Sequence, residues 1–158
     1  MRPSARASGT LTNCVRTRAA ATLAAGEIMG LSRAGQPIGI AAPEVTGSSY
    51  ARIKAREALE DARVYGLPLF VDSGAFSAFR RGVPLTATDW RKNFALYDQL
   101  ADQYGNLLYA VAPDVLTDQQ ATLLLLEQYA PELSALIDRG VQVIVPLQQG
   151  HPKQRGCV

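Results

Sequence analysis

Cysteine and histidine are scarce in this 158-residue chain, which holds only Cys14, Cys157 and His151. The two cysteines stand near opposite ends and form no C-x-x-C pair, which excludes a self-contained Cys/His zinc site and argues against a disulfide framework. A reducing, cytoplasmic setting is then the default expectation. We expect neither a metal ion nor a cofactor, and we expect His151 to lie in an exposed loop rather than to act as a base.

The sequence also lacks long apolar runs, strong net charge and glycine-rich phosphate motifs. No apolar stretch approaches the roughly 20 residues that a membrane span needs. A formal net charge of +2 is too small to indicate nucleic acid by itself. Neither a P-loop nor a G-x-G-x-x-G motif occurs, which disfavours a nucleotide-binding fold that holds phosphates in a glycine-rich loop. No Ser/His/Asp catalytic triad can be identified in the sequence. The 47% hydrophobic and 19% charged residues are typical of one ordinary globular domain.

Residues 1–35 differ in composition from the rest of the chain. They carry no acid before Glu27, and their early basic residues are Arg2, Arg6, Arg16 and Arg18. We interpret them as a basic leader, disordered or partly helical; a phosphate-binding arm and a targeting segment are the alternatives, in that order. An alanine-rich helix is expected over residues 17–29, ended by Gly30.

Strand and helix patterns alternate over residues 36–150, before a short tail at 151–158. The expected strands are residues 37–41, 68–71, 107–111 and 141–147. Helices are expected from Ser48 or Ser49 to about Val64, from Thr86 or Thr88 to Tyr104, and from Asp118 to residue 139. Because strands alternate with helices, the sequence predicts an α/β fold of parallel (β/α) repeats with right-handed crossovers.

Details of the helices follow from spacing and capping chemistry. The inner face of the first long helix is expected at Tyr50, Ile53, Leu59 and Ala62. The second is expected to bury Trp90, Phe94, Tyr97, Ala101 and Tyr104, which recur at four-three spacing. Thr117 is expected to cap the third helix, with Gln120 completing a capping box. Pro131 should kink that helix or start a second one.

Polar residues follow each expected strand. They are Glu44, Asp72 with Ser73, Asp114, and Gln148 with Gln149. In a parallel sheet these exits share one edge, where α/β folds bind ligands. Carboxylates accept N–H bonds and glutamine both donates and accepts, which suits an amide-like ligand edge. The alternative for Asp72 and Ser73 is that one of them caps a helix starting near Ala75, with Gly74 easing the turn.

Three motifs are similar to those of a known superfamily. They are FVDSGAFS at 70–77, VAPD at 111–114 and VPLQQG at 145–150. In this order they resemble the tRNA-guanine transglycosylase superfamily, and most closely its DpdA-type deazapurine DNA-modification proteins. Ala75 and Ser77 depart from the family pattern, in which a second glycine and a glutamine stand there.

The resemblance implies base exchange within a (β/α)8 barrel, in which a 7-deazaguanine such as preQ0 replaces guanine, with DNA favoured over tRNA. Asp72 matches the aspartate that handles protons on the exchanging base. Asp114 matches the acceptor for the purine N–H edge. Ser73, Gly74 and Phe76 match residues that would shape the pocket. Gln149 and Gly150 match the pair that would bind the other edge of the purine, and Gln148 is the alternative to Gln149.

The nucleophilic carboxylate that base exchange with retention requires is missing from these motifs. The resemblance implies that it comes from a later strand, beyond Val158. About four of eight barrel strands are expected, so we interpret the chain as the N-terminal half of such an enzyme: a truncated product, a split subunit or a remnant. A missing C-terminal half or partner subunit is therefore expected, besides nucleic acid and the free deazapurine base.

Basic residues follow the first motif. They are Arg80, Arg81, Arg91 and Lys92. These residues either contact backbone phosphates or form a solvated face, and we favour the solvated face. Two other functions stay open for the whole chain. One is a non-catalytic module or remnant that binds a purine or nucleic acid, and the other is an unrelated TIM-barrel enzyme that uses Asp72 as its acid/base.

Overall fold

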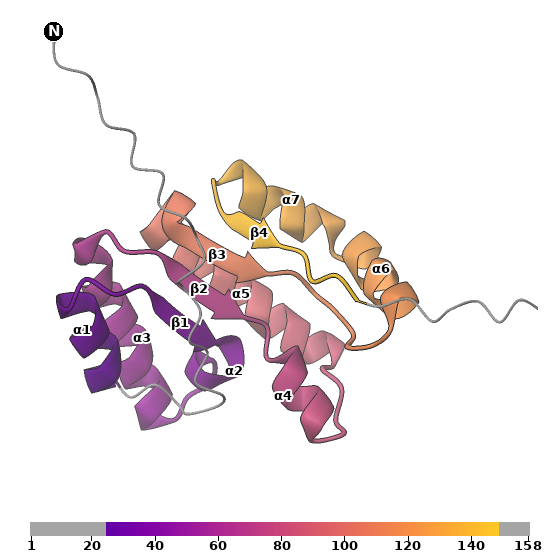
Figure 1. The fold of residues 1–158 in the computed structure, drawn as a ribbon, viewed down its shortest axis with the longest axis horizontal. Helices are drawn as coiled ribbons and strands as arrows, with labels where there is room; N and C mark the ends of the chain where they lie inside the picture. Colours follow the sequence, from indigo (N-terminus) through magenta and orange to yellow (C-terminus); the bar gives the residue numbers. More distant parts are fainter. Residues whose placement is uncertain (1–24, 149–158) are drawn as a thin grey trace, which may run out of the picture.

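The computed structural model describes residues 25–148, which fold around a four-stranded parallel sheet of order β1-β2-β3-β4 (Figure 1). The strands are β1 (Ile38–Ala41), β2 (Leu69–Asp72), β3 (Leu108–Val111) and β4 (Gln142–Ile144). Each strand pairs in parallel with the next strand along the chain. The predicted α/β class with parallel strands and alternating helices is confirmed.

Seven α-helices are assigned within the described residues, together with two 3-10 turns at Arg63–Tyr65 and Gly105–Leu107. They are α1 (Ala25–Arg33), α2 (Ala42–Val45), α3 (Tyr50–Ala62), α4 (Ala75–Arg80), α5 (Ala87–Tyr104), α6 (Gln119–Gln128) and α7 (Ala130–Asp138). Pro131 lies in the first turn of α7. Of the two predicted effects of Pro131, a kink or the start of a second helix, the structure shows the second. Within residues 25–148, no helix has both the length and the apolar character needed to cross a membrane.

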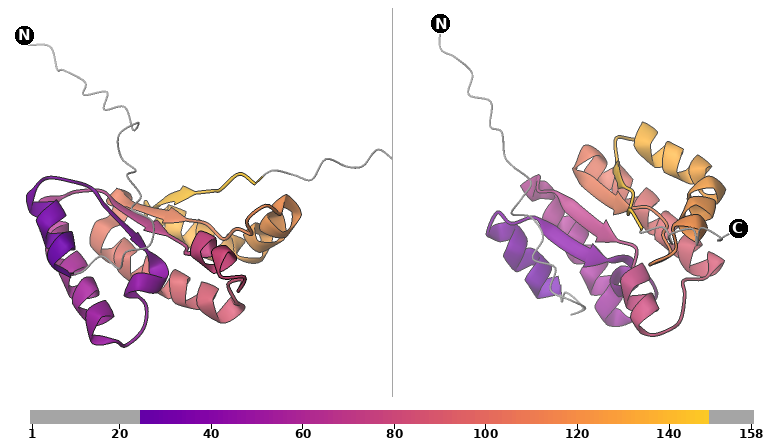
Figure 2. Two further views of the ribbon diagram at one scale, coloured as in Figure 1. Left: turned by 60° about the horizontal axis from the view of Figure 1, so that its bottom comes forward. Right: turned by 45° about the vertical axis from the view of Figure 1, so that its right-hand side comes forward.

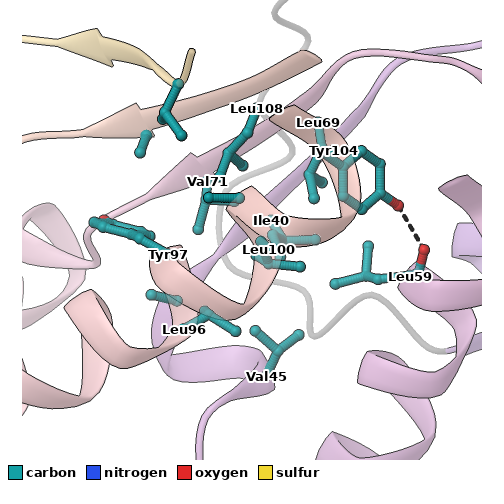
Figure 3. Packing of buried hydrophobic residues seen from close by; sticks show 14 of the residues in the cluster. Ile40, Val45, Leu59, Leu69, Val71, Leu96, Tyr97, Leu100, Tyr104 and Leu108 are labelled. Carbon is teal, nitrogen blue, oxygen red and sulfur yellow. Dashed lines mark hydrogen bonds between the residues drawn. The ribbon is translucent and has the colours of Figure 1, made fainter. Parts of the chain in front are cut away.

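The hydrophobic core lies between one face of the sheet and the longer helices. Ile40, Val71 and Leu108 point from three strands toward Leu96 and Leu100 of α5 (Figure 3). All members of the predicted inner face of α5 are buried, namely Trp90, Phe94, Tyr97, Ala101 and Tyr104. The hydroxyl of Tyr104 donates a hydrogen bond to the carbonyl of Leu59, which ties α5 to α3 (Figure 3).

The opposite face of the sheet carries none of the longer helices (Figure 2, left). Gly39, Phe70, Tyr109 and Gln142 are register neighbours across the four strands, and all four stay exposed or half-buried. Sequential strand order with right-handed crossovers places successive helices on the same face, which explains this asymmetry. A parallel sheet is usually covered on both faces, whereas this sheet is covered by the longer helices on one face within the described residues.

The start of the folded domain differs from the prediction. The expected helix over 17–29 lies in part outside the described residues, and its expected stop at Gly30 is wrong because α1 continues to Arg33. The left-handed turn residue is instead Gly35, at φ 69°. Ile28 is fully buried in the core, so residues 25–35 belong to the domain and not to a leader.

The inner face of α3 was also predicted incorrectly in part. Tyr50 is 76% exposed and Ile53 is 37% exposed, whereas Leu59 and Ala62 are buried as expected. The buried stripe is Ala55, Ala58, Leu59 and Ala62. These positions have the i, i+3, i+4, i+7 spacing of one helical face, and the first turn of α3 does not continue it.

The predicted capping box at Thr117 is wrong. Asp118 is the N-cap of α6, and its Oδ1 accepts a 2.9 Å hydrogen bond from the backbone N–H of Ala121. Thr117 lies before the helix at φ 64°, and its backbone N–H donates to Oε1 of Gln148. The helix cap is therefore one residue later than predicted, and Thr117 lies just before it.

The last strand is shorter than predicted. It covers Gln142–Ile144 rather than residues 141–147, and residues 145–148 continue without regular structure. Pro146 has no backbone N–H to donate to a ladder, which explains why pairing ends before it.

Candidate functional site

Three carboxylates gather beyond the C-terminal ends of β1, β2 and β3. Glu44 lies on α2 directly after β1, Asp72 ends β2, and Asp114 lies in the loop after β3. Burial raises the pKa of both Glu44 and Asp114 most, and the negative charge of Asp72 raises both pKa values further. These strand exits therefore meet at one edge of the sheet, as the parallel topology predicts.

Asp72 is held in place by its own turn. Its Oδ2 accepts a 3.2 Å hydrogen bond from the backbone N–H of Gly74. Gly74 is the N-cap of α4 and adopts φ 82°, a left-handed conformation that glycine tolerates. Burial raises the pKa of Asp72, and hydrogen bonds from the backbone of Gly74 and Ser73 oppose that rise. A carboxyl group with a raised pKa is suited to giving and taking a proton.

Ser73 is buried below the carboxylates and hydrogen-bonds to both α4 and α5. It is 0% exposed, its Oγ accepts a hydrogen bond from the N–H of Ala75, and its carbonyl accepts a 2.9 Å bond from Nδ2 of Asn93. A hydrogen bond from Ser73 also lowers the pKa of Asp114. α4 begins at Ala75, as that alternative predicted, but its N-cap is Gly74 and not Asp72 or Ser73.

Asp114 and Gln148 join the second and third sequence motifs. Asp114 is 7% exposed, and its Oδ2 accepts a 2.8 Å hydrogen bond from Nε2 of Gln148. Burial raises the pKa of Asp114 most, the charge of Asp72 raises it further, and hydrogen bonds from Gln148 and Ser73 lower it. Gln149 and Gly150 lie outside the described residues, so the predicted contact of that pair has no structural account.

Two residues of α5 reach this site that the sequence did not single out for it. The hydroxyl of Tyr97 donates a 3.0 Å hydrogen bond to the carbonyl of Val111. Burial raises the pKa of Tyr97, and the charges of Asp72 and Asp114 raise it further. Asn93 supports the turn at Ser73 from below. Its signal in the sequence is a polar residue on the same helical face as Trp90 and Tyr97.

The other predicted site residues lie along α4. The side chain of Phe76 is 54% exposed, and within the described residues its ring makes no aromatic contact. Arg80 and Arg81 are both exposed at the end of the helix. Of the two, only Arg81 lines a cavity of about 260 Å³ that lies between α4, α5 and the loop after α2.

Among residues 25–148, no group of three or more His, Cys, Asp or Glu side chains is arranged to hold a metal ion. No protein-family model matches the sequence, and neither a curated protein nor a solved structure matches it. The three motifs and the geometry of their side chains are therefore the grounds on which a function can be argued.

Proposed function

We propose that this chain is part of a base-exchange transglycosylase of the tRNA-guanine transglycosylase superfamily, most similar to the DpdA-type deazapurine DNA-modification proteins. The proposed reaction replaces guanine in DNA with a 7-deazaguanine such as preQ0, in the cytoplasm. One observation carries the proposal. The motifs at 70–77 and 111–114 supply two carboxylates, Asp72 and Asp114, whose charges interact, and the motif at 145–150 supplies the Gln148 bond to Asp114.

Asp72 has the environment of a proton-handling acid. When the bond between the sugar carbon and guanine breaks, the departing ring nitrogen needs a proton, and the incoming base must lose one before it attacks. Burial raises the pKa of Asp72, so this carboxyl group can hold a proton closer to neutrality than a solvated aspartate does. The sugar carbon would meanwhile be held by a carboxylate nucleophile that we expect from a later barrel strand.

Asp114 has the environment of a base-reading acceptor. Gln148 donates to its Oδ2 and Ser73 donates a hydrogen bond to the same carboxylate, whose remaining lone pairs can accept N–H bonds from a guanine or deazaguanine edge. Both ends of the Gln148 amide are engaged, by Asp114 and by the N–H of Thr117. We therefore assign Gln148 to orienting Asp114, and reading of the other purine edge falls to Gln149 and Gly150. A buried acceptor left unpaired by a wrong base would penalise that base strongly.

The sheet supports the finer proposal of a TIM-type half-barrel. A (β/α)8 barrel has eight parallel strands in sequential order, with its helices outside and its catalytic residues at the C-terminal ends of the strands. The four strands here are sequential and parallel, and one face is free of the longer helices. In this proposal that face, which carries Phe70 and Tyr109, lines the barrel interior, and a further segment or a partner subunit completes the barrel.

Incorporation of radiolabelled guanine into DNA and into tRNA tests the proposal. The wild-type chain, together with the product of the neighbouring gene, is expected to label DNA, and Asp72→Asn is expected to abolish labelling. Asp138→Asn is the matched control, because Asp138 is exposed at the end of α7, and it should leave labelling intact. Absence of labelling in both nucleic acids, with the partner present, would remove the enzyme assignment.

A non-catalytic purine-binding module is the second candidate. It is favoured by the four strands of the described residues, which supply Asp72 and Asp114 at the ends of an open sheet rather than within a closed barrel. Guanine or preQ0 binding without exchange, weakened by Asp114→Asn, would identify this function. If neither base binds, an unrelated TIM-barrel enzyme with Asp72 as its acid/base becomes the better proposal.

A further inference from the structure

A cavity of about 260 Å³ lies next to the carboxylate cluster and is built from other residues. Three cationic side chains line it from three different elements: Arg52 from α3, Arg81 after α4, and Lys92 from α5. Among the described residues that line it, Asp89 is the one acid. Cations from separate parts of the chain therefore converge on one small hollow.

The positive charge of this cavity is neutralised only in part by the described residues, because Asp89 and Lys92 interact. Within residues 25–148, neither Arg52 nor Arg81 makes an ion pair or a side-chain hydrogen bond. Asp89 is engaged elsewhere, because its Oδ2 accepts a 2.9 Å bond from the backbone N–H of Thr86 and a 2.7 Å bond from the Thr86 hydroxyl. These bonds lower the pKa of Asp89, and the charge of Lys92 lowers it further, so Asp89 stays ionised as the third residue of the α5 capping box, whose N-cap is Thr86. Three cations face one carboxylate that is already bonded.

One wall of the cavity is held rigidly. Arg56 donates hydrogen bonds to the carbonyl of Val45 and, at 2.8 Å, to the carbonyl of Gly47. Gly47 adopts φ 102°, and a Cβ atom built there would lie 3.1 Å from Nη1 of Arg52. The guanidinium of Arg52 therefore rests against a backbone segment that Arg56 anchors, and the missing side chain leaves room for it.

The floor of the cavity is connected to the carboxylate site. Asn93 lines the cavity and is 3% exposed, and its Nδ2 donates a 2.9 Å hydrogen bond to the carbonyl of Ser73. The same turn carries Asp72 and Gly74, whose N–H bonds to the Asp72 carboxylate. Asn93 thus connects a group bound in the cavity to the turn that positions Asp72.

We propose that this cavity binds a phosphate group. Its volume is below the roughly 300–1,000 Å³ of pockets that enclose a whole drug-sized ligand, so it suits a small anion or one end of a longer ligand. Two guanidinium groups supply the planar pairs of donors that phosphate oxygens accept, and the Lys92 ammonium adds a point charge. The phosphate belongs either to a free phosphate or nucleotide or to a nucleic-acid backbone. The site goes beyond the proposed base exchange and does not depend on it.

Titration of the purified chain with inorganic phosphate, a deoxynucleoside monophosphate and a single-stranded oligodeoxynucleotide tests this site by calorimetry. Arg81→Gln and Arg52→Gln are expected to weaken phosphate binding by roughly tenfold each, the effect of one charge-assisted hydrogen bond. Arg80→Gln is the matched control. Arg80 is the sequence neighbour of Arg81 and is also exposed, but it does not line the cavity, so binding should change less than about twofold.

The three ligands separate the sources of the phosphate. Loss of affinity for the oligodeoxynucleotide in Arg81→Gln, with a reduced salt dependence, supports a backbone phosphate. Loss for inorganic phosphate and the monophosphate alone supports a free phosphate ligand. The proposal is overturned if none of the three binds, or if Arg80→Gln and Arg81→Gln lose affinity equally.

Two further measurements keep the result interpretable. Circular dichroism melting checks that each variant is folded, and Lys92→Gln replaces Arg52→Gln if the latter does not fold. Asp72→Asn should retain phosphate binding, because Asp72 does not line the cavity. Loss of base exchange with phosphate binding intact would therefore bear on the carboxylate site alone.

Discussion

The carboxamide Nε2 of Gln148 donates a 2.8 Å hydrogen bond to Oδ2 of Asp114, although 34 residues separate them in the chain. The same carboxamide accepts a bond from the backbone N–H of Thr117 through its Oε1. One side chain thus connects the segment after β4 to the loop after β3. This contact draws the third sequence motif onto the second and sets the orientation of the carboxylate that we assign to base reading.

Replacing Gln148 should change the titration of Asp114. Gln148→Ala removes a hydrogen bond that lowers the pKa of Asp114, so that pKa should rise. Carbon-detected NMR of the side-chain carboxyl group during a pH titration measures it directly. Gln128→Ala, at an exposed position near the end of α6, is the control and should leave the Asp114 pKa unchanged. An unaltered Asp114 titration in Gln148→Ala would contradict the contact.

Asp72→Asn should stabilise the fold at neutral pH. Burial raises the folded-state pKa of Asp72, so the folded chain binds this proton more tightly than the unfolded chain does. The contribution of Asp72 to stability therefore falls as the pH rises from the ordinary carboxyl range through the raised pKa. The asparagine variant lacks this loss and should gain up to about 1 kcal/mol at neutral pH, which is within the range of single stabilising substitutions.

Urea unfolding at neutral and at mildly acidic pH measures this difference. The gap between Asp72→Asn and the wild type should close as the pH falls, because the wild-type carboxyl becomes protonated. Asp138→Asn, at the exposed end of α7, should show no comparable pH-dependent gap. A gap that widened on acidification would show that the pKa of Asp72 is lowered rather than raised.

Gly74→Ala should destabilise the chain by about 2–3 kcal/mol, because two costs act together. Gly74 has φ 82°, and a Cβ atom there would lie 2.6 Å from Cγ of Pro43. Gly30→Ala, inside α1 with nothing within 4 Å of the added atom, should instead stabilise by about 0.5–1 kcal/mol. Thermal unfolding of both variants provides the comparison, and equal melting temperatures would refute the steric argument.

Tyr97→Phe should cost about 1–3 kcal/mol, because it leaves the carbonyl of Val111 without its side-chain donor in a buried setting. Tyr109→Phe is the matched control. The hydroxyl of Tyr109 makes no hydrogen bond within the described residues, and its ring lies on the face of the sheet that the longer helices leave open. Its removal should change the free energy of unfolding by about 0.5 kcal/mol or less in a denaturant titration.

Local patterns predicted the elements better than their ends. The buried face of α5, which carries Trp90 and Tyr97, was predicted correctly because its helical periodicity repeats over many residues. Tyr50 and Ile53 were misassigned because the first turn of α3 lies beyond the packed stripe. The Thr117 cap was wrong because the next residue, Asp118, is a stronger capping residue, and its Oδ1 accepts the bond from the N–H of Ala121.

The alternation of strands and helices along the chain, the amphipathic face of α5 and the acid or amide after each strand were all determined by the sequence alone. These features depend on spacing, on apolar runs and on turn residues, which act between neighbours in the chain. Only the tertiary structure decided which of those side chains meet. It brought Gln148 to Asp114 and Asn93 to Ser73, and it gave Arg81 rather than Arg80 a place in the cavity wall. Such contacts depend on how crossovers and helices pack, and that packing joins residues whose separation in the chain carries no local signal.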